Sequence, residues 1–146
     1  MEKINLSLSN LITKSARVVV RHYQREVAAF GITPSQAGVV YILSIIGPST
    51  QVEIAKRLHL EKTNVNAMVR KLERAGFIRI EKHGSDARKS VVALTKKGGT
   101  LAEELVAVDE KVGRIYLGMA GSGANAKVIR SFLEKIVFDD HDDRDE

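Results

Sequence analysis

Residues 50–77 read TQVEIAKRLHLEKTNVNAMVRKLERAGF and contain two short helical patterns separated by a tight turn. The first pattern, Gln51 to Leu58, follows Thr50, and Glu53 stands three residues after that threonine, which is the spacing of a capping box. The second, Glu61 to Ala75, repeats apolar residues at steps of three and four, as a helix with one buried face does. Two short helices joined by a brief turn predict a helix-turn-helix, whose second helix is the recognition helix.

The period of the apolar residues changes from that of a helix to that of a strand after Gly76, a glycine in the position that commonly ends a helix. Residues 77–81 and 90–95 have the character of short strands, and the polar stretch 82–89 between them is typical of a hairpin tip. Because two strands alone are not stable in water, we expect the hairpin to lean on the neighbouring helices. A helix-turn-helix followed by a hairpin predicts a winged helix-turn-helix.

Longer helical patterns lie on both sides of this segment. Apolar residues recur from Ile4 to Phe30 and predict one long amphipathic helix, and Thr33-Pro34 starts a second helix that runs to about Ile46. Beyond the hairpin, a stripe from Leu101 to Met119 predicts another long helix, and a last one follows the glycine-rich turn 118–123. We therefore expect a mainly α-helical fold with a small β-hairpin wing.

The terminal helices carry more apolar stripe than one small lobe can cover, and a second copy of the chain is the simplest cover. We expect dimerisation helices at residues 1–32 and 101–138, a winged DNA-binding domain at 33–100 and an acidic flexible tail at 139–146. The two-fold axis of such a dimer would place its recognition helices about one DNA turn apart, roughly 34 Å, or a near multiple of that distance.

The net charge of +5 is unevenly spread along the 146 residues. Residues 49–98 carry twelve Lys or Arg against five acids, residues 1–48 carry five against two, and residues 101–146 carry six against eleven. A basic segment of this kind is the electrostatic signature of a polyanion site, although a solvated surface can have the same composition.

Several protein classes are excluded by what the sequence lacks. It has no cysteine, so disulfides, thiolate metal sites and thiol redox switches are absent. Its four histidines are far apart, and no phosphate-loop or nucleophile-elbow pattern occurs, so we expect neither an enzyme nor a metal or cofactor. Without an export signal or an apolar run of about 20 residues, we expect a soluble cytoplasmic protein that does not bind membranes.

The sequence resembles the MarR family of bacterial transcription regulators over nearly its whole length. The resemblance rests on Ile32–Gln36, on the helix-turn-helix from Gln51 to Ile78, and most specifically on Asp86-Ala87-Arg88, followed at the family's spacing by Leu94-Thr95 and Lys96-Lys97-Gly98. It implies an obligate homodimer whose two winged lobes bind a pseudo-palindromic operator on double-stranded DNA. It also implies release from DNA by a small anionic or phenolic ligand, the usual behaviour of a repressor in this family.

On the predicted recognition helix, residues near the N-terminus should face base edges. The candidates are Lys62, Thr63, Asn64, Asn66, Ala67 and Arg70. Asn bonds adenine in a bidentate way and Arg prefers guanine or phosphate, so we assign Asn64, Asn66 and Arg70 to bases. Lys62 and Thr63 are assigned to phosphate or bases, whereas Thr63 and Asn64 could instead satisfy free amides of the helix start. Ala67 stands where many family members have a basic residue, a departure that weakens the case for one base contact.

The wing supplies a second set of candidates: Lys82, His83, Ser85, Asp86, Arg88 and Lys89. The resemblance sends Arg88 into the minor groove, where narrow A·T-rich segments attract a guanidinium, with Asp86 orienting it. The alternative is a surface ion pair that only stiffens the hairpin. Further candidates for the DNA backbone are Ser35, Thr50 and Gln51, each at a helix start where a capping role is equally compatible.

The candidates for a ligand site complete the set: Arg17, Arg21, His22, Arg25 and Tyr41. A guanidinium and an aromatic wall are what a carboxylate ligand requires, but a basic stripe can equally be solvated or paired with a partner's acids, and Tyr41 can be a core residue. Two other functions remain open. They are an architectural DNA-binding protein of low specificity, and a protein-interaction module that has lost DNA binding.

Overall fold

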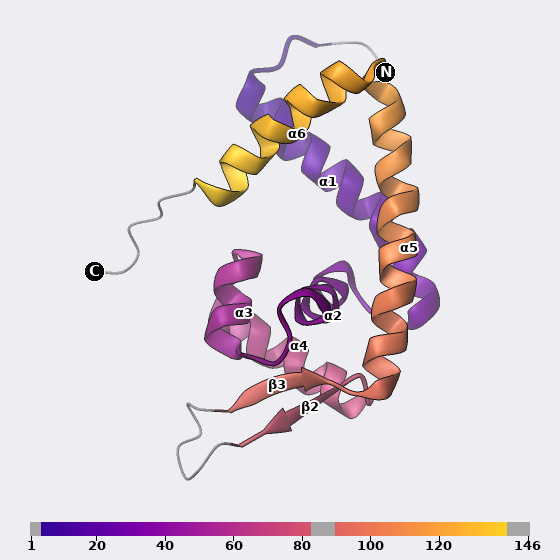
Figure 1. The fold of residues 1–146 in the computed structure, drawn as a ribbon. Coiled ribbons are helices and arrows are strands. Elements are labelled where there is room, and N and C mark those ends of the chain that lie inside the picture. Colours follow the sequence, from indigo (N-terminus) through magenta and orange to yellow (C-terminus); the bar gives the residue numbers. More distant parts are fainter. Residues whose placement is uncertain (1–3, 83–89, 140–146) are drawn as a thin grey trace, which may run out of the picture. The chain divides into compact units, whose positions relative to one another are not determined.

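The computed structural model describes residues 4–82 and 90–139 (Figure 1). The elements in chain order are α1 (Leu8–Val27), the 3-10 turn η1 (Ala28–Phe30), α2 (Pro34–Ile46), β1 (Ser49–Thr50), α3 (Gln51–Leu58), α4 (Lys62–Arg74), β2 (Ile78–Glu81), β3 (Val91–Leu94), α5 (Lys96–Met119) and α6 (Gly123–Phe138). The chain divides into two compact units, and the boundary between them in the sequence falls between Asp109 and Glu110. The predicted mainly helical fold with a β-hairpin wing is confirmed.

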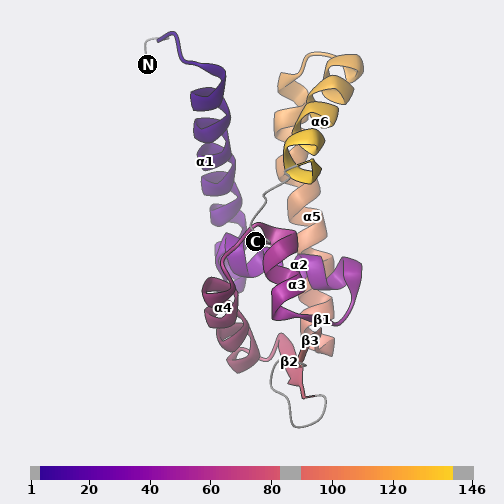
Figure 2. The ribbon, with the colours of Figure 1, turned by 90° about the vertical axis from the view of Figure 1, so that its left-hand side faces the viewer.

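The first unit is built around one aliphatic core to which every helix from α1 to α5 contributes. Its buried side chains are Val27, Ile32, Ala37, Val39, Val40, Leu43, Ile54, Ala55, Val65, Val69, Leu72, Ile78, Val92, Leu101, Ala102 and Leu105. On α4 the buried positions are Val65, Val69 and Leu72, as the apolar period predicted, and Met68 is half-buried against them. Figure 2 shows α3 and α4 joined by their short turn, with the hairpin following α4. The face of α4 opposite Val65, Val69 and Leu72 is exposed to solvent.

Local capping sets the predicted helix boundaries. Gly31 adopts a left-handed φ of 70° before α2, and the Thr33 Oγ1 accepts from the Gln36 amide at 3.2 Å. The Gln36 side chain in turn accepts from the Thr33 amide at 3.0 Å, which completes a capping box. His59 and Gly76, with φ of 50° and 81°, form the predicted turn and the predicted stop after α4.

The sheet has one strand more than the hairpin that the sequence predicted. β1 pairs antiparallel with β3, and the strand order is β1-β3-β2. Ser49 lies opposite Val92 and Thr50 opposite Val91, so the two residues before α3 add an edge strand to the wing. Two residues are too few to show a strand period, which is why the pattern did not reveal this strand.

The first helix is shorter than predicted. The apolar pattern begins at Ile4, but α1 starts at Leu8 because the Ser7 hydroxyl accepts from the Asn10 amide at 3.4 Å and sets the helix start. The helix also tightens into η1 over its last three predicted residues. No single helix within residues 4–82 and 90–139 is long and apolar enough to span a membrane, although Leu8–Phe30 and Pro34–Ile46, bent by 79°, pass that test as a pair.

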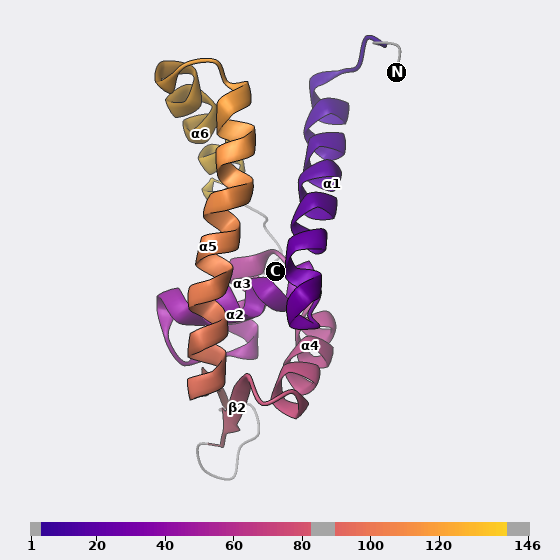
Figure 3. The same ribbon diagram turned by 90° about the vertical axis from the view of Figure 1, so that its right-hand side faces the viewer.

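Residues 94–98, the last part of the MarR-like sequence pattern, connect the sheet to α5 (Figure 3). α5 begins at Lys96, ahead of the predicted stripe, because the Thr95 Oγ1 accepts from the Gly98 amide at 3.1 Å and donates to the Gly76 carbonyl at 2.6 Å. The Lys97 Nζ donates to the Ala75 carbonyl at 2.8 Å and lies 4.6 Å from the centre of the Phe77 ring. These contacts attach the first turn of α5 to the end of α4.

The second unit consists of the end of α5 and of α6, joined through a turn in which Gly121 has a φ of 78° and Ser122 caps α6. None of the residues of α6 is buried. An apolar groove of about 490 Å³ runs along the unit, and it is lined by Gly113, Tyr116, Leu117, Ala120, Ala126, Ile129, Arg130, Leu133, Glu134, Val137 and Phe138. The helical hairpin by itself therefore leaves most of its apolar side chains uncovered.

Candidate nucleic-acid interface

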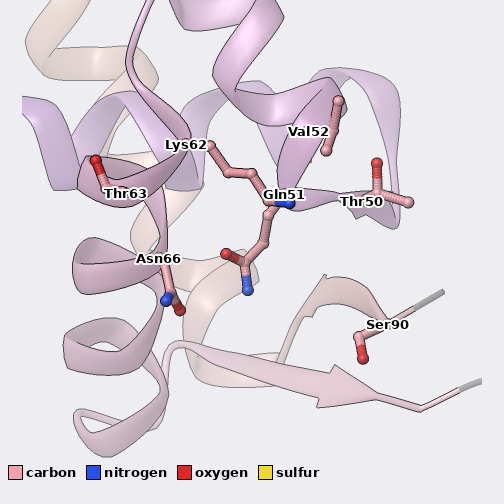
Figure 4. A pocket seen from close by; sticks show the side chains of 7 residues that line it. All are labelled: Thr50, Gln51, Val52, Lys62, Thr63, Asn66 and Ser90. Atoms are coloured by element: carbon pink, nitrogen blue, oxygen red, sulfur yellow. The ribbon is translucent and has the colours of Figure 1, made fainter. Parts of the chain in front are cut away.

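The N-terminal turns of α3 and α4 meet around one pocket of about 410 Å³. It is lined by Thr50, Gln51, Val52, Lys62, Thr63, Asn66 and Ser90 (Figure 4). Figure 4 shows Gln51 and Asn66 extending into this space from the two helices. Five of the seven lining residues were predicted from the sequence as DNA contacts, three on the recognition helix and two as backbone contacts. The fold thus brings together candidates that are up to 16 residues apart in the chain.

Two lining residues were not predicted. Val52 is 58% exposed at the second position of α3, and its apolar side chain gave no polar signal to single it out. Ser90 precedes β3 at the base of the predicted wing. Its position next to the predicted hairpin tip was the one sequence signal that could have identified it as a DNA contact. Ser90 shows that the pocket extends from the helix-turn-helix to the hairpin.

At the start of α3, the Thr50 hydroxyl acts as a helix cap. Its Oγ1 accepts from the Glu53 amide at 3.2 Å, as the capping alternative proposed. The Glu53 carboxylate pairs with the Arg57 Nε at 2.7 Å on the exposed side of the helix. Ser35 lies at the start of a different helix, α2, where Thr33 is the cap, and it is not among the residues of the pocket. The three backbone candidates are therefore at two separate sites, with Thr50 and Gln51 together.

The recognition-helix candidates all lie on the exposed side of α4. Its N-cap is Glu61, which makes no side-chain cap hydrogen bond. Because the helix begins at Lys62, Thr63 and Asn64 occupy its second and third positions, and neither is the N-cap. The six candidates, Lys62, Thr63, Asn64, Asn66, Ala67 and Arg70, are each exposed. The side chains of Asn66 and Arg70 contact each other, with the Arg70 Nε donating to the Asn66 Oδ1 at 3.3 Å. This surface offers polar groups to a ligand while the opposite face of α4 fills the core.

The wing is described only at its base. Lys82 follows β2 and is exposed, whereas the other candidates, His83, Ser85, Asp86, Arg88 and Lys89, lie outside the described residues. β2 and β3 pair from Ile78 opposite Leu94 to Glu81 opposite Val91. The Arg79 guanidinium is used within this hairpin, since its Nε contacts the Glu81 carboxylate at 2.7 Å and its Nη1 donates to the Leu94 carbonyl at 2.6 Å.

The ligand candidates are dispersed over α1 and α2. Arg17, Arg21 and Arg25 are exposed on α1, and His22 and Tyr41 are half-buried. None of these five residues lines either of the two pockets described above.

Tyr23, which sequence reasoning did not single out, has its pKa raised by burial and further by the nearby Asp109 and Tyr41, so its hydroxyl remains a hydrogen-bond donor at neutral pH. Within the described ranges, no group of three or more His, Asp or Glu side chains could hold a metal ion.

The helix-turn-helix, the three-stranded wing and the exposed polar face of α4 define a winged helix-turn-helix DNA-binding protein. The MarR family model matches residues 30–89. The chain is 34% identical over 105 residues to the uncharacterised HTH-type transcriptional regulator YwoH of Bacillus subtilis, an alignment covering 72% of this chain and 76% of YwoH. The chain belongs to the MarR family, whose members are DNA-binding transcriptional regulators and not enzymes.

Two solved structures share the fold. The DNA complex of MepR from Staphylococcus aureus superposes with a TM-score of 0.81 at 22% identity, covering 91% of this chain and 98% of MepR. BpsR of Bordetella bronchiseptica, whose DNA binding is regulated by 6-hydroxynicotinic acid, gives a TM-score of 0.81 at 23% identity, over 88% of this chain and 97% of BpsR. At these identities the likeness concerns the fold.

Proposed function

We propose that the chain is a sequence-specific, homodimeric DNA-binding regulator that acts as a repressor and is released from its operator by a small molecule. The observation that carries the proposal is the pocket between α3 and α4. There, the half-buried Gln51 and the exposed Lys62 and Asn66 place two amides and an ammonium group around one opening. Ammonium and amide groups contact phosphate oxygens, and side chains of a recognition helix contact base edges. The pocket is thus suited to the edge of a DNA groove.

The homodimer is supported by the exposed apolar side chains of the second unit. Along α6, Val128, Phe132 and Ile136 recur every four residues and are 69%, 42% and 45% exposed. A helical hairpin with this much uncovered apolar surface is stabilised by a partner, and a second copy of the same chain provides an equivalent surface. The domain division expected from the sequence, with dimerisation helices from both ends of the chain, remains part of this proposal.

Release from DNA by a small molecule is supported by the side chains of α1 and α2 and by one protein of similar fold. BpsR is regulated by 6-hydroxynicotinic acid, an aromatic hydroxy acid. Exposed guanidinium groups at Arg17, Arg21 and Arg25 suit a carboxylate, and the half-buried Tyr41 suits an aromatic ring. We therefore expect small aromatic acids to be the class of ligand that lowers DNA affinity.

The test is a fluorescence-anisotropy titration on the intergenic DNA beside the protein's own gene and on a shuffled duplex, each at two salt concentrations. We expect a preference of about 10³ or more for the native duplex, with affinity for both falling as salt rises. Equal, salt-sensitive binding to both would favour the architectural alternative. Binding to neither would favour a protein-interaction module.

We predict that Arg88→Ala weakens binding to the native duplex by about 1–3 kcal/mol, because one minor-groove contact of the wing is lost. The thermal unfolding midpoint should remain unchanged, since the sequence predicts a polar hairpin tip over residues 82–89, outside the apolar pattern of the core. The measurement is anisotropy at matched salt, with Lys127→Ala on the exposed surface of α6 as a control for loss of one positive charge. Equal affinities of Arg88→Ala and the parent would refute the wing assignment.

A further inference from the structure

The outer face of α4 carries four residues in register: Thr63, Asn66, Ala67 and Arg70. Steps of three and four residues lead from Thr63 to Asn66 and Ala67 and from these two to Arg70, so the four residues share one face of the helix. Within this face the side chains of Asn66 and Arg70 contact each other, with the Arg70 Nε donating to the Asn66 Oδ1 at 3.3 Å. Ala67, between them in sequence, has no side chain beyond its methyl group to separate the pair.

This hydrogen bond changes what Asn66 can offer to a ligand. A free asparagine presents both an acceptor and a donor, which is the combination that reads adenine. Here the acceptor, Oδ1, faces the Arg70 guanidinium, and the Nδ2 keeps both of its N–H groups. Arg70 retains the four N–H groups of Nη1 and Nη2 and brings a positive charge next to the amide. The pair as a whole therefore presents mainly hydrogen-bond donors, six N–H groups against the one lone pair that the Asn66 Oδ1 retains.

A surface made of donors discriminates among base edges. In the major groove guanine presents two acceptors, N7 and O6, whereas adenine and cytosine each present an amino donor that would meet the N–H groups of the pair. Thymine presents one acceptor beside a methyl group. Guanine is thus the base whose edge satisfies the pair most completely.

We infer that Asn66 and Arg70 act as one donor unit that selects a guanine in each half of the operator. The inference rests on the proposed sequence-specific DNA binding and adds the base that this part of α4 reads. It replaces the expectation, drawn from the sequence, that Asn66 bonds adenine by itself. The mutual contact also restrains the Arg70 side chain before DNA binds, which lowers the entropy lost on binding.

The test is selection of binding sites from a random duplex library with the full-length protein, followed by sequencing. The parent should enrich a two-fold symmetric motif with a guanine in each half. Asn66→Ala and Arg70→Ala should each reduce the guanine preference about tenfold at that same base pair, and leave the other positions of the motif unchanged. Asn66→Asp, which keeps an oxygen partner for Arg70 and removes the Nδ2 donors, should also weaken it. Both side chains are exposed, so circular dichroism melting is expected to show that the variants fold.

The matched control is Lys71→Ala, because Lys71 is exposed on the same helix but off the face of Asn66 and Arg70, and it is not among the candidate DNA contacts. It should leave the guanine preference unchanged. Adenine at the shared position, or loss of preference at two different base pairs in the two alanine variants, would overturn the inference while leaving sequence-specific binding intact. A library from which the parent enriches no motif would instead overturn the proposed sequence-specific function, and the inference with it.

Discussion

Gly98→Ala is expected to lower the free energy of unfolding by about 3 kcal/mol, at the upper end of what overpacking costs. A Cβ at this position would overlap the carbonyl oxygen of Phe77, and the Leu94 side chain lies 3.2 Å away on another side. The obstacle is backbone, and it is held in place because the same carbonyl accepts from the Thr95 amide at 3.0 Å. The first turn of α5 would have to move away from the sheet, which would disturb the Thr95 hydrogen bonds to Gly76 and Gly98.

The neighbouring residue provides a matched control for this prediction. Gly99 is in the same helical turn, and a Cβ there would meet nothing within 4 Å. Gly99→Ala should therefore raise the free energy of unfolding by roughly 0.5–1 kcal/mol, because alanine is the better helix former. Urea denaturation of both variants at one protein concentration is the measurement. Similar effects of the two substitutions would show that helix propensity, and not the contact with Phe77, decides the stability of the connection between the sheet and α5.

The close approach of Gly98 to Phe77 also shows which contacts cannot be predicted from the sequence. Thr33-Pro34 and Thr50 identify helix starts because a cap is a contact between residues three apart in the chain. The start of α5 has a local cap of the same kind, Thr95, but the need for glycine at position 98 depends on the backbone at Phe77, which is 21 residues earlier. Two consecutive glycines in a helical turn oppose local propensity, and the close approach that explains the first of them becomes visible only in three dimensions. β1 was missed for two reasons, since two residues show no strand period and its partner β3 lies about 40 residues further along the chain.

Within the candidate interface, the identity of the residues was easier to predict than their partners. Period and exposure distinguish the outer face of α4 from Val65 and Val69 in the core, so the recognition-helix candidates follow from the sequence. The apolar period does not single out Val52 or Ser90, because their place in the pocket comes from the packing of α3, α4 and β3. It also treats Asn66 and Arg70 as separate readers, whereas the hydrogen bond between them changes which base edges they fit.

The apolar face of α6 leads to the second large effect. Phe132→Glu is expected to convert the dimer into a monomer and to weaken binding to the native duplex about a thousandfold, which corresponds to about 4 kcal/mol. A monomer holds one half-site only, so its affinity should approach that for non-specific DNA. The residue is 42% exposed in the single chain, so the chain can accommodate a carboxylate there, whereas an apolar interface with a second copy cannot bury that charge without a partner.

The control for this substitution is Ser131→Glu, which adds the same charge one residue earlier, at an exposed polar position of the same helix. Analytical ultracentrifugation and anisotropy, each at the same protein concentrations, measure the two expected losses, and circular dichroism checks that α6 remains helical. Ser131→Glu should remain dimeric and retain most of its affinity. Because the two variants share net charge, a difference between them isolates the apolar contact of Phe132 from general electrostatics. A dimeric Phe132→Glu with full affinity would place the subunit interface elsewhere, and the uncovered stripe Val128, Phe132 and Ile136 would then need a different partner.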